Sequence, residues 1–181
     1  MSLLNKNNAI ITVTAGMVLA SSSAFAATAS SGEGIVRFQG SVIAAPCSIA
    51  PESVDQTIDF GQLSKAHLDA GGISQKKILN IDLLNCTVDA SGATKNTVQV
   101  TFSGDSGTAD DELPTSGGTN TSIVINGYGE NVTYGTPTPA VTFLNGSNTL
   151  TFDTWAKMAT GSTEVNTGEF TAVSNFILTY A

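Results

Sequence analysis

The sequence has few charged residues, and most of those are acidic. Only 12% of its 181 residues are charged, with 7 lysines and arginines against 15 aspartates and glutamates. Nucleic acids and anionic lipid surfaces are bound through clustered Lys and Arg, so this composition argues against both classes of partner. A chain with so little charge is expected to cover much of its surface with Thr, Ser, Asn and Gly, or with other copies of itself.

Histidine and cysteine are also scarce, which limits catalytic and metal chemistry. His67 is the single histidine, and it lies in a polar segment where a solvated side chain is expected. Cys47 and Cys86 lack the CxxC spacing of a redox pair and the paired ligands of a zinc site. The acidic cluster at residues 110–112 lacks the spacing of a calcium loop and is expected to be a solvated loop tip. We therefore predict no enzyme activity, no metal and no cofactor.

The longest apolar stretch lies at the start of the chain. Lys6 is followed by an uncharged stretch at residues 9–20, and Ala24 and Ala26 flank Phe25 in a small-x-small cleavage pattern. This predicts a secretory signal peptide at residues 1–26; the alternative is a buried N-terminal helix. The stretch is shorter than the ~20 apolar residues that a membrane helix needs. Removing 26 of 181 residues leaves 155, with 6 basic and 15 acidic residues and a net charge of −9, enough for one domain with its own core.

Export determines how the two cysteines are interpreted. An even number of cysteines in an oxidising compartment predicts one disulfide, Cys47–Cys86. Both residues lie beside strand-like runs, so the bond is expected to join two strands. The chain-entropy model gives such a loop a stabilisation of roughly 4 kcal/mol.

The rest of the mature chain is dominated by short segments with the two-residue period of β-strands. A turn of helix is expected within residues 62–70, with Leu63 and Leu68 inward, and polar loops are expected at 103–122 and 161–168. Turn signals occur at Asn126-Gly127 and Asn145-Gly146. The order of elements predicts an antiparallel β-sandwich. The expected strands are residues 57–60, 77–84, 97–102, 123–125, 149–155 and 170–180.

Alternating segments also occupy both ends of the mature chain. In residues 34–42 one face carries Val36, Phe38, Gly40 and Val42, and the other carries Ile35, Arg37, Gln39 and Ser41. In the last segment, Phe176, Leu178 and Tyr180 share one face with Phe170 and Ala172, while Val173 and Ile177 share the other. The first segment is either an arm that adds to a neighbouring molecule or the first strand of its own sandwich.

Several motifs follow one another along the mature chain. The arm alternates around Gly40, and the segment after it ends in Ala45-Pro46-Cys47. Gly168 is fourteenth from the end and Tyr180 is penultimate. The remaining motifs are Ser53-Val54-Asp55-Gln56-Thr57, Phe60-Gly61-Gln62-Leu63, Leu84-Asn85-Cys86, and Asn145-Gly146-Ser147-Asn148-Thr149 before Phe152 and Ala156. With these motifs in this order, the mature chain resembles the shaft subunits of chaperone–usher fimbriae, close to the type 1 major pilin family.

The resemblance implies an incomplete immunoglobulin-like sandwich that is completed by a donor strand from a neighbouring subunit. It divides the chain into a signal peptide (1–26), a donor-strand extension (27–43) and a pilin domain (44–181). Val36, Phe38, Gly40 and Val42 would be the donor strand. The last strand would form the groove edge and bind the chaperone through Gly168, Phe176, Leu178, Tyr180 and Ala181; for Gly168 an ordinary turn, and for Tyr180 an ordinary core position, are the alternatives.

The function that the resemblance implies is that of a structural fimbrial subunit, exported through the periplasm to the cell surface. Its implied partners are other copies of itself, related pilin subunits, a periplasmic chaperone and an outer-membrane usher, with receptor binding by a surface loop left open. The alternative is a minor or tip-located adhesin that binds a host receptor. A third class, a secreted binding protein, would need the arm to fold back onto its own sandwich.

Overall fold

The computed structural model describes residues 34–88, 96–105 and 107–181, so the expected signal peptide lies outside the described residues. The chain divides into two units, Met1–Gly40 and Ser41–Ala181. In the first unit, the described residues form no helix or strand. The second unit contains all the regular elements described below.

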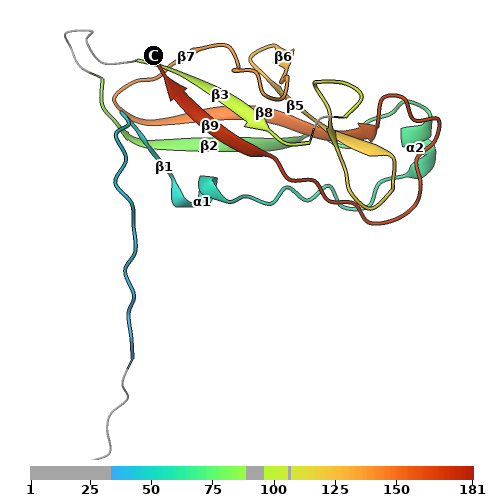
Figure 1. Cartoon of the computed structure of the whole chain (residues 1–181), viewed down its shortest axis with the longest axis horizontal. Helices are drawn as coiled ribbons and strands as arrows, with labels where there is room; N and C mark the ends of the chain where they lie inside the picture. The colour runs from blue at the N-terminus through green and yellow to red at the C-terminus, as the bar shows by residue number, and fades with distance from the viewer. Residues whose placement is uncertain (1–33, 89–95, 106) are drawn as a thin grey trace, which may run out of the picture. The chain divides into compact units, whose positions relative to one another are not determined.

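The second unit is a β-sandwich of two antiparallel sheets (Figure 1). One sheet has the strand order β1-β2-β8-β5-β4, with β6 paired to β5, and the other has the order β7-β3-β9. The strands are β1 (Ser48–Ile49), β2 (Lys77–Cys86), β3 (Thr97–Ser103), β4 (Leu113–Pro114), β5 (Thr121–Gly127), β6 (Glu130–Asn131), β7 (Val141–Thr142), β8 (Gly146–Met158) and β9 (Asn175–Tyr180). The predicted sandwich is confirmed.

The core forms because alternate residues of both sheets face inward. In the larger sheet, β2 and β8 pair Leu79 with Phe152 and Ile81 with Leu150. In the smaller sheet, Val100 and Phe102 of β3 face the same cluster. The rings of Phe102 and Phe152 meet edge to face at 5.1 Å between centroids, which joins the two sheets.

Two short helices flank the sheets, α1 (Pro51–Val54) and α2 (Lys65–Asp69). The predicted helical turn corresponds to α2, where Ser64 caps the N-terminus and Leu68 is buried. Helix α1 was not predicted; it begins with proline, which is compatible with the first helical position. No helix among the described residues has the length and apolar character needed to span a membrane.

The predicted strand at residues 57–60 is wrong. Ile58 and Phe60 are half-buried while Thr57 and Asp59 are exposed, so the alternation is real. However, no neighbouring strand pairs with this segment among the described residues. Alternating burial arises from one apolar face, whereas a strand also requires a hydrogen-bonded partner.

The predicted polar loop at residues 103–122 is also wrong in part. The segment includes β4 and the start of β5, and Glu112 and Thr119 are only 3% and 2% exposed. The predicted solvated acidic tip therefore holds for Asp110, which is exposed, but not for Glu112. Polar side chains can be buried here because they are hydrogen-bonded, as Thr119 is to Thr121 at 2.8 Å.

The predicted hairpin after β5 exists, but its turn lies two residues later than expected. Asn126 and Gly127 pair with Asn131 and Glu130, so Tyr128 and Gly129 form the turn. Both have positive φ angles, 57° and 94°, as the tight hairpin turn requires. Gly127 is the last residue of β5. The position requires glycine, because any side chain there would collide with the ring of Phe152.

Candidate functional site

The last strand, β9, has one open edge. It pairs with β3 in register from Val98↔Tyr180 to Ser103↔Asn175, and it has no partner on its other side among the described residues. The expected strand began at residue 170, but the chain before β9 instead pairs with another segment, where Ser116 N donates to Thr171 O at 2.8 Å. An open edge presents unpaired backbone groups to an added strand.

The register shows which backbone groups of β9 face that open edge. Thr97 and Ala181 exchange two hydrogen bonds, at 3.0 and 3.1 Å. Because hydrogen-bonded pairs alternate along an antiparallel ladder, Thr179 and Ile177 also point their backbone groups toward β3. The N–H and C=O groups of the three intervening residues, Phe176, Leu178 and Tyr180, therefore point toward the open edge.

The same three residues direct their side chains into the sandwich. Phe176, Leu178 and Tyr180 are half-buried against the core, whereas Ile177 on the other face is 64% exposed. The ring of Phe176 lies 6.3 Å from that of Phe102, and the ring of Tyr180 meets Phe143 edge to face at 5.7 Å. The Tyr180 hydroxyl is buried without a hydrogen-bond partner among the described residues. This edge thus combines unpaired backbone with incompletely covered apolar side chains.

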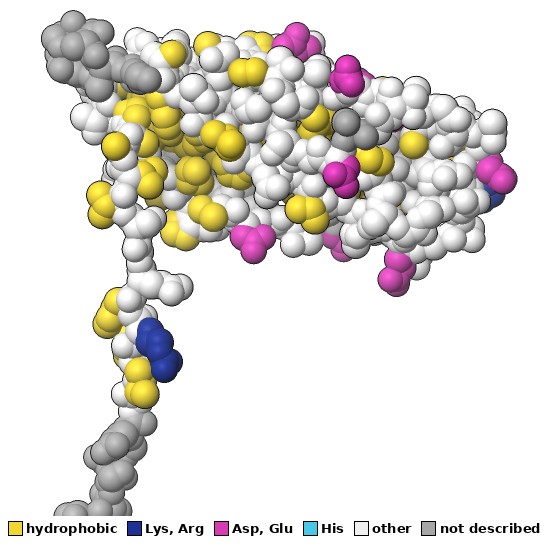
Figure 2. All heavy atoms as spheres, in the orientation of Figure 1, with side chains coloured by type: hydrophobic (Ala, Val, Ile, Leu, Met, Phe, Trp, Pro, Cys, Tyr) yellow, Lys and Arg dark blue, Asp and Glu magenta, His cyan; other side chains and the backbone are white. Residues whose placement is uncertain are grey.

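The other sheet contributes its own edge, β1, to the same core. Ile49 is half-buried against the cluster that β9 also contacts. Figure 2 shows hydrophobic side chains gathered on the face where Figure 1 draws β9 near β1 and β2. We call the half-buried residues Ile49, Phe176, Leu178 and Tyr180 the open apolar strip. Its side chains are apolar and only partly covered, so the strip can accept further apolar groups.

The predicted disulfide is confirmed. Cys47 and Cys86 are bonded, with their Cα atoms 4.1 Å apart. Cys86 ends β2 and Cys47 immediately precedes β1, which pairs with β2. The bond therefore fixes the β1 edge beside the open apolar strip.

The arm at residues 34–42 forms no strand, and its apolar side chains are exposed. Val36, Phe38 and Val42 are 73%, 92% and 101% exposed. Figure 2 shows hydrophobic and basic side chains along the arm. A methyl group added at Gly40 would meet nothing within 4 Å. Three large apolar side chains exposed on one face are unusual for a segment of a folded monomer.

Gly168 and Ala181, which were predicted to act with β9, lie in different places. Gly168 lies in the segment before β9, beside Thr119, with a φ of 156°. Its backbone conformation favours glycine whatever its role. Ala181 continues β9 and is exposed, although one of its carboxylate oxygens accepts a 2.9 Å hydrogen bond from the Thr97 hydroxyl. Phe176, Leu178, Tyr180 and Ala181 are thus brought together on one edge, and Gly168 is not.

The sequence analysis missed a buried ionic cluster around Glu112. The carboxylate of Glu112 accepts hydrogen bonds from Ser122, Lys157 and the backbone N–H of Thr160. Burial alone would raise the pKa of Glu112, but the bonds from Lys157, Thr160 and Ser122 outweigh it and lower the pKa to about 2. No sequence signal distinguishes Glu112 from its exposed neighbours.

His67 is exposed on α2, with Nε2 3.1 Å from the carbonyl oxygen of Ile73. Within the described ranges, no group of three or more His, Cys, Asp or Glu side chains is arranged to hold a metal ion.

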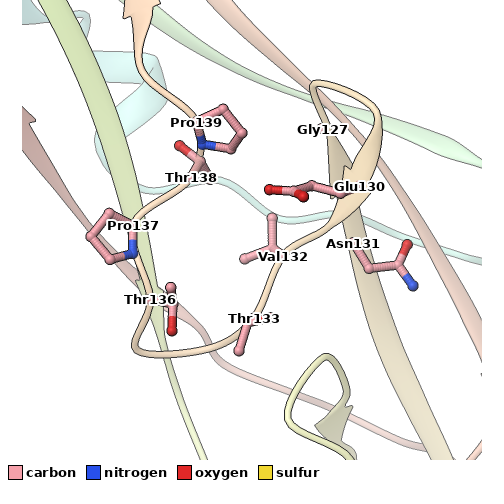
Figure 3. A pocket seen from close by; sticks show the side chains of 9 residues that line it. All are labelled: Gly127, Glu130, Asn131, Val132, Thr133, Thr136, Pro137, Thr138 and Pro139. Atoms are coloured by element: carbon pink, nitrogen blue, oxygen red, sulfur yellow. The ribbon is translucent and has the colours of Figure 1, made fainter.

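A small cavity of about 90 Å³ lies between the β5–β6 hairpin and the loop that follows it (Figure 3). Glu130 and Val132 point toward it in Figure 3, while Asn131 points away and donates a hydrogen bond to Asp111. None of the residues predicted to be functional lines this cavity.

Comparison with known proteins accounts for the open edge. The family model described as "Fimbrial protein" matches residues 36–181. The chain belongs to the fimbrial protein family. The resemblance found in the sequence is therefore confirmed.

Individual members of the family match over most of their length. The Pap fimbrial major pilin protein of Escherichia coli is 45% identical over 162 residues, which are 86% of this chain and 88% of that protein. The fimbria A protein of Serratia marcescens is 40% identical over 161 residues, 87% of this chain and 90% of that protein.

Two solved structures are also similar to this fimbrial protein. The P pilus rod subunit PapA is 43% identical with a TM-score of 0.71, covering 76% of this chain and all (100%) of that one. A subunit in the structure of a chaperone–usher pilus is 45% identical with a TM-score of 0.80, covering 85% of this chain and 99% of that one. The fold is accordingly the incomplete immunoglobulin-like sandwich of the fimbrial subunits.

Proposed function

We propose that this protein is a structural shaft subunit of an adhesive surface fimbria, exported through the periplasm by a chaperone and an outer-membrane usher, and polymerised by donor-strand exchange. The observation that carries the proposal is the open edge of β9. There Phe176, Leu178 and Tyr180 combine backbone groups that face outward with side chains that are only half covered. The arm of a second copy provides the missing strand.

The arm has the chemistry that this edge requires. Val36, Phe38 and Val42 share one face, so a strand that enters with that face inward buries all of them together. Burial of a large apolar side chain stabilises by about 1.5–3 kcal/mol, so the three contribute on the order of 5–9 kcal/mol. New backbone hydrogen bonds along β9 add about 0.5–1.5 kcal/mol each.

Before assembly, a periplasmic chaperone occupies the same edge. In this proposal Phe176, Leu178 and Tyr180 contact the chaperone's strand, and the C-terminal carboxylate of Ala181 pairs with basic groups of the chaperone. The exposure of Ala181 supports this assignment. Gly168, which lies away from β9, contributes through the conformation of the chain that leads into the strand.

Replacing Phe38 with aspartate tests the proposal. A carboxylate at this position cannot enter an apolar strip without a large desolvation cost. We expect sheared surface material from wild-type cells to give a heat-sensitive ladder on gels, and F38D to give only monomer. The matched control is Gln39→Asp, which places the same charge on the opposite face of the arm and should retain the ladder. A ladder from F38D as strong as that from Q39D would refute the donor role of the arm.

A further inference from the structure

The outer face of β9 carries an exposed apolar residue that the core does not use. Ile177 is 64% exposed. It points away from the half-buried residues of the open apolar strip, because successive side chains of a strand alternate between its faces. Ile177 is paired with Thr101 of β3, so its neighbour in the sheet leaves it uncovered.

The arm also has a second face, opposite Val36 and Phe38. On this face Ile35 is the only large apolar residue, followed by Arg37, Gln39 and Ser41. Ile35 is 79% exposed.

Sheet geometry relates these two exposed surfaces. When a strand adds to the open edge of β9 with Val36 and Phe38 directed inward, its alternate residues must lie on the outer face of the extended sheet. Residues on the same face of adjacent strands contact one another when they are directly opposite, and long side chains also reach diagonal neighbours. Ile35 of the arm and Ile177 of β9 therefore share a face in any register that keeps the inward row inward.

We infer that Ile35 in the arm of one subunit packs against Ile177 on the outer face of β9 in the next, forming a second apolar contact on the solvent side of the joint. This inference rests on the proposed donor-strand function. The occupant of the outer face is thus a named segment of a second copy, and the joint is held on both faces of the inserted strand.

A double-mutant cycle tests the contact. The variants are Ile35→Thr, Ile177→Thr and the double variant, because threonine preserves β-strand propensity while removing apolar surface. The measurement is the rate at which purified fimbriae dissociate to monomer in a fixed concentration of denaturant. Each single variant should dissociate about two- to fivefold faster than wild type. The double variant should be no faster than the more affected single variant, since only one contact is lost.

The control is Ile78→Thr, at a residue on β2 that is 62% exposed, close to the 64% of Ile177. Its fimbriae should dissociate at the wild-type rate. The inference is overturned if the effects of I35T and I177T multiply in the double variant, or if I177T dissociates no faster than I78T. Failure of the donor-strand function itself would instead be seen as a ladder from F38D, so the two failures are distinguishable.

Discussion

Glu112 and Lys157 form an ion pair inside a network of polar side chains. The side chain of Glu112 is 4% exposed and that of Lys157 is 31% exposed, and Ser122 and Thr160 complete the bonds to the carboxylate. A buried carboxylate would destabilise the fold on its own, but its hydrogen bonds offset the cost of removing it from water. The cluster joins the segment before β4 to β5 and β8 of the sandwich.

Replacing Glu112 with glutamine should make the protein less stable and alter its response to acid. The change leaves Lys157 without its partner and should lower the free energy of unfolding by about 3 kcal/mol at neutral pH. The pKa of Glu112 is about 2 in the fold, below the ordinary value of 4.5, so its contribution is full above pH 4.5 and is lost as the pH falls toward 2. Thermal unfolding followed by circular dichroism at several pH values measures both effects.

Ser122→Ala is the control for this experiment, because it removes one donor and leaves the ion pair. Ser122→Ala should lower the free energy of unfolding less than E112Q does. The stability of this variant should still fall as the pH drops from 4.5 to 2, by much of the amount expected for wild type. If E112Q unfolded at the same temperature as wild type at pH 7, the stabilising role of the cluster would be wrong.

Gly40 is the residue of the arm at which a methyl group should matter most. Within a single chain nothing lies within 4 Å of an added Cβ, so Gly40→Ala should fold normally. In the proposed joint between subunits, Gly40 would face inward with Phe38 and Val42, where we expect no room for a side chain. Overpacking there should cost about 1–3 kcal/mol and should slow or block polymerisation.

The measurement for Gly40→Ala is the amount of ladder from sheared surface material relative to periplasmic monomer. Ser41→Ala, which places a methyl group on the outward face of the arm, should assemble as wild type does. Normal fimbriae from G40A would contradict the predicted close approach at Gly40.

At the scale of elements, the disulfide supports the edge that β1 forms. It closes a loop with a sequence separation of 39 and joins the end of β2 to the residue before β1. Replacing both Cys47 and Cys86 with serine should lower the free energy of unfolding by roughly 4 kcal/mol, because the unfolded chain regains the freedom of that loop. Denaturant unfolding of the purified protein measures the difference, and equal midpoints for variant and wild type would show that the bond contributes little.

The sequence predicts well the strands that pair with a neighbouring strand. β2, β3 and β8 were expected because alternating apolar residues in each face one core. The segment at 57–60 has the same alternation but lacks a partner, and pairing depends on distant parts of the chain. Glu112 could not have been placed in the interior, since its burial depends on Lys157 and Thr160, which lie far along the sequence.

The candidate site could be predicted only in part, because it too depends on how strands pair with distant parts of the chain. Parity alone grouped Phe176, Leu178 and Tyr180 on one face of the last strand, and the structure shows that this face is the inner one. Parity could not show that β9 has an open edge, nor that Gly168 lies beside Thr119. The open edge follows from the order of strands in the smaller sheet.

At the scale of the whole molecule, the chain carries an incomplete sandwich and an exposed apolar arm on the same polypeptide. The open edge of β9 exposes backbone groups, and the arm exposes Val36, Phe38 and Val42. When the arm of one copy joins the edge of the next, each added copy uses one of these two parts. Its other part, the arm or the edge, stays free to join a further copy. A head-to-tail contact of this kind produces an open fibre when its rotation does not close a ring.

The most direct test of this account is amide hydrogen exchange in β9 of purified fimbriae, resolved to single residues. The N–H groups of Ile177 and Thr179 point toward β3 and serve as internal references. The account predicts that the N–H groups of Phe176, Leu178 and Tyr180 are protected in fimbriae as strongly as these references, because an inserted arm bonds to them. Rapid exchange at Phe176, Leu178 and Tyr180 beside protected Ile177 and Thr179 would show that the edge stays open in the fibre, and would contradict donor-strand assembly.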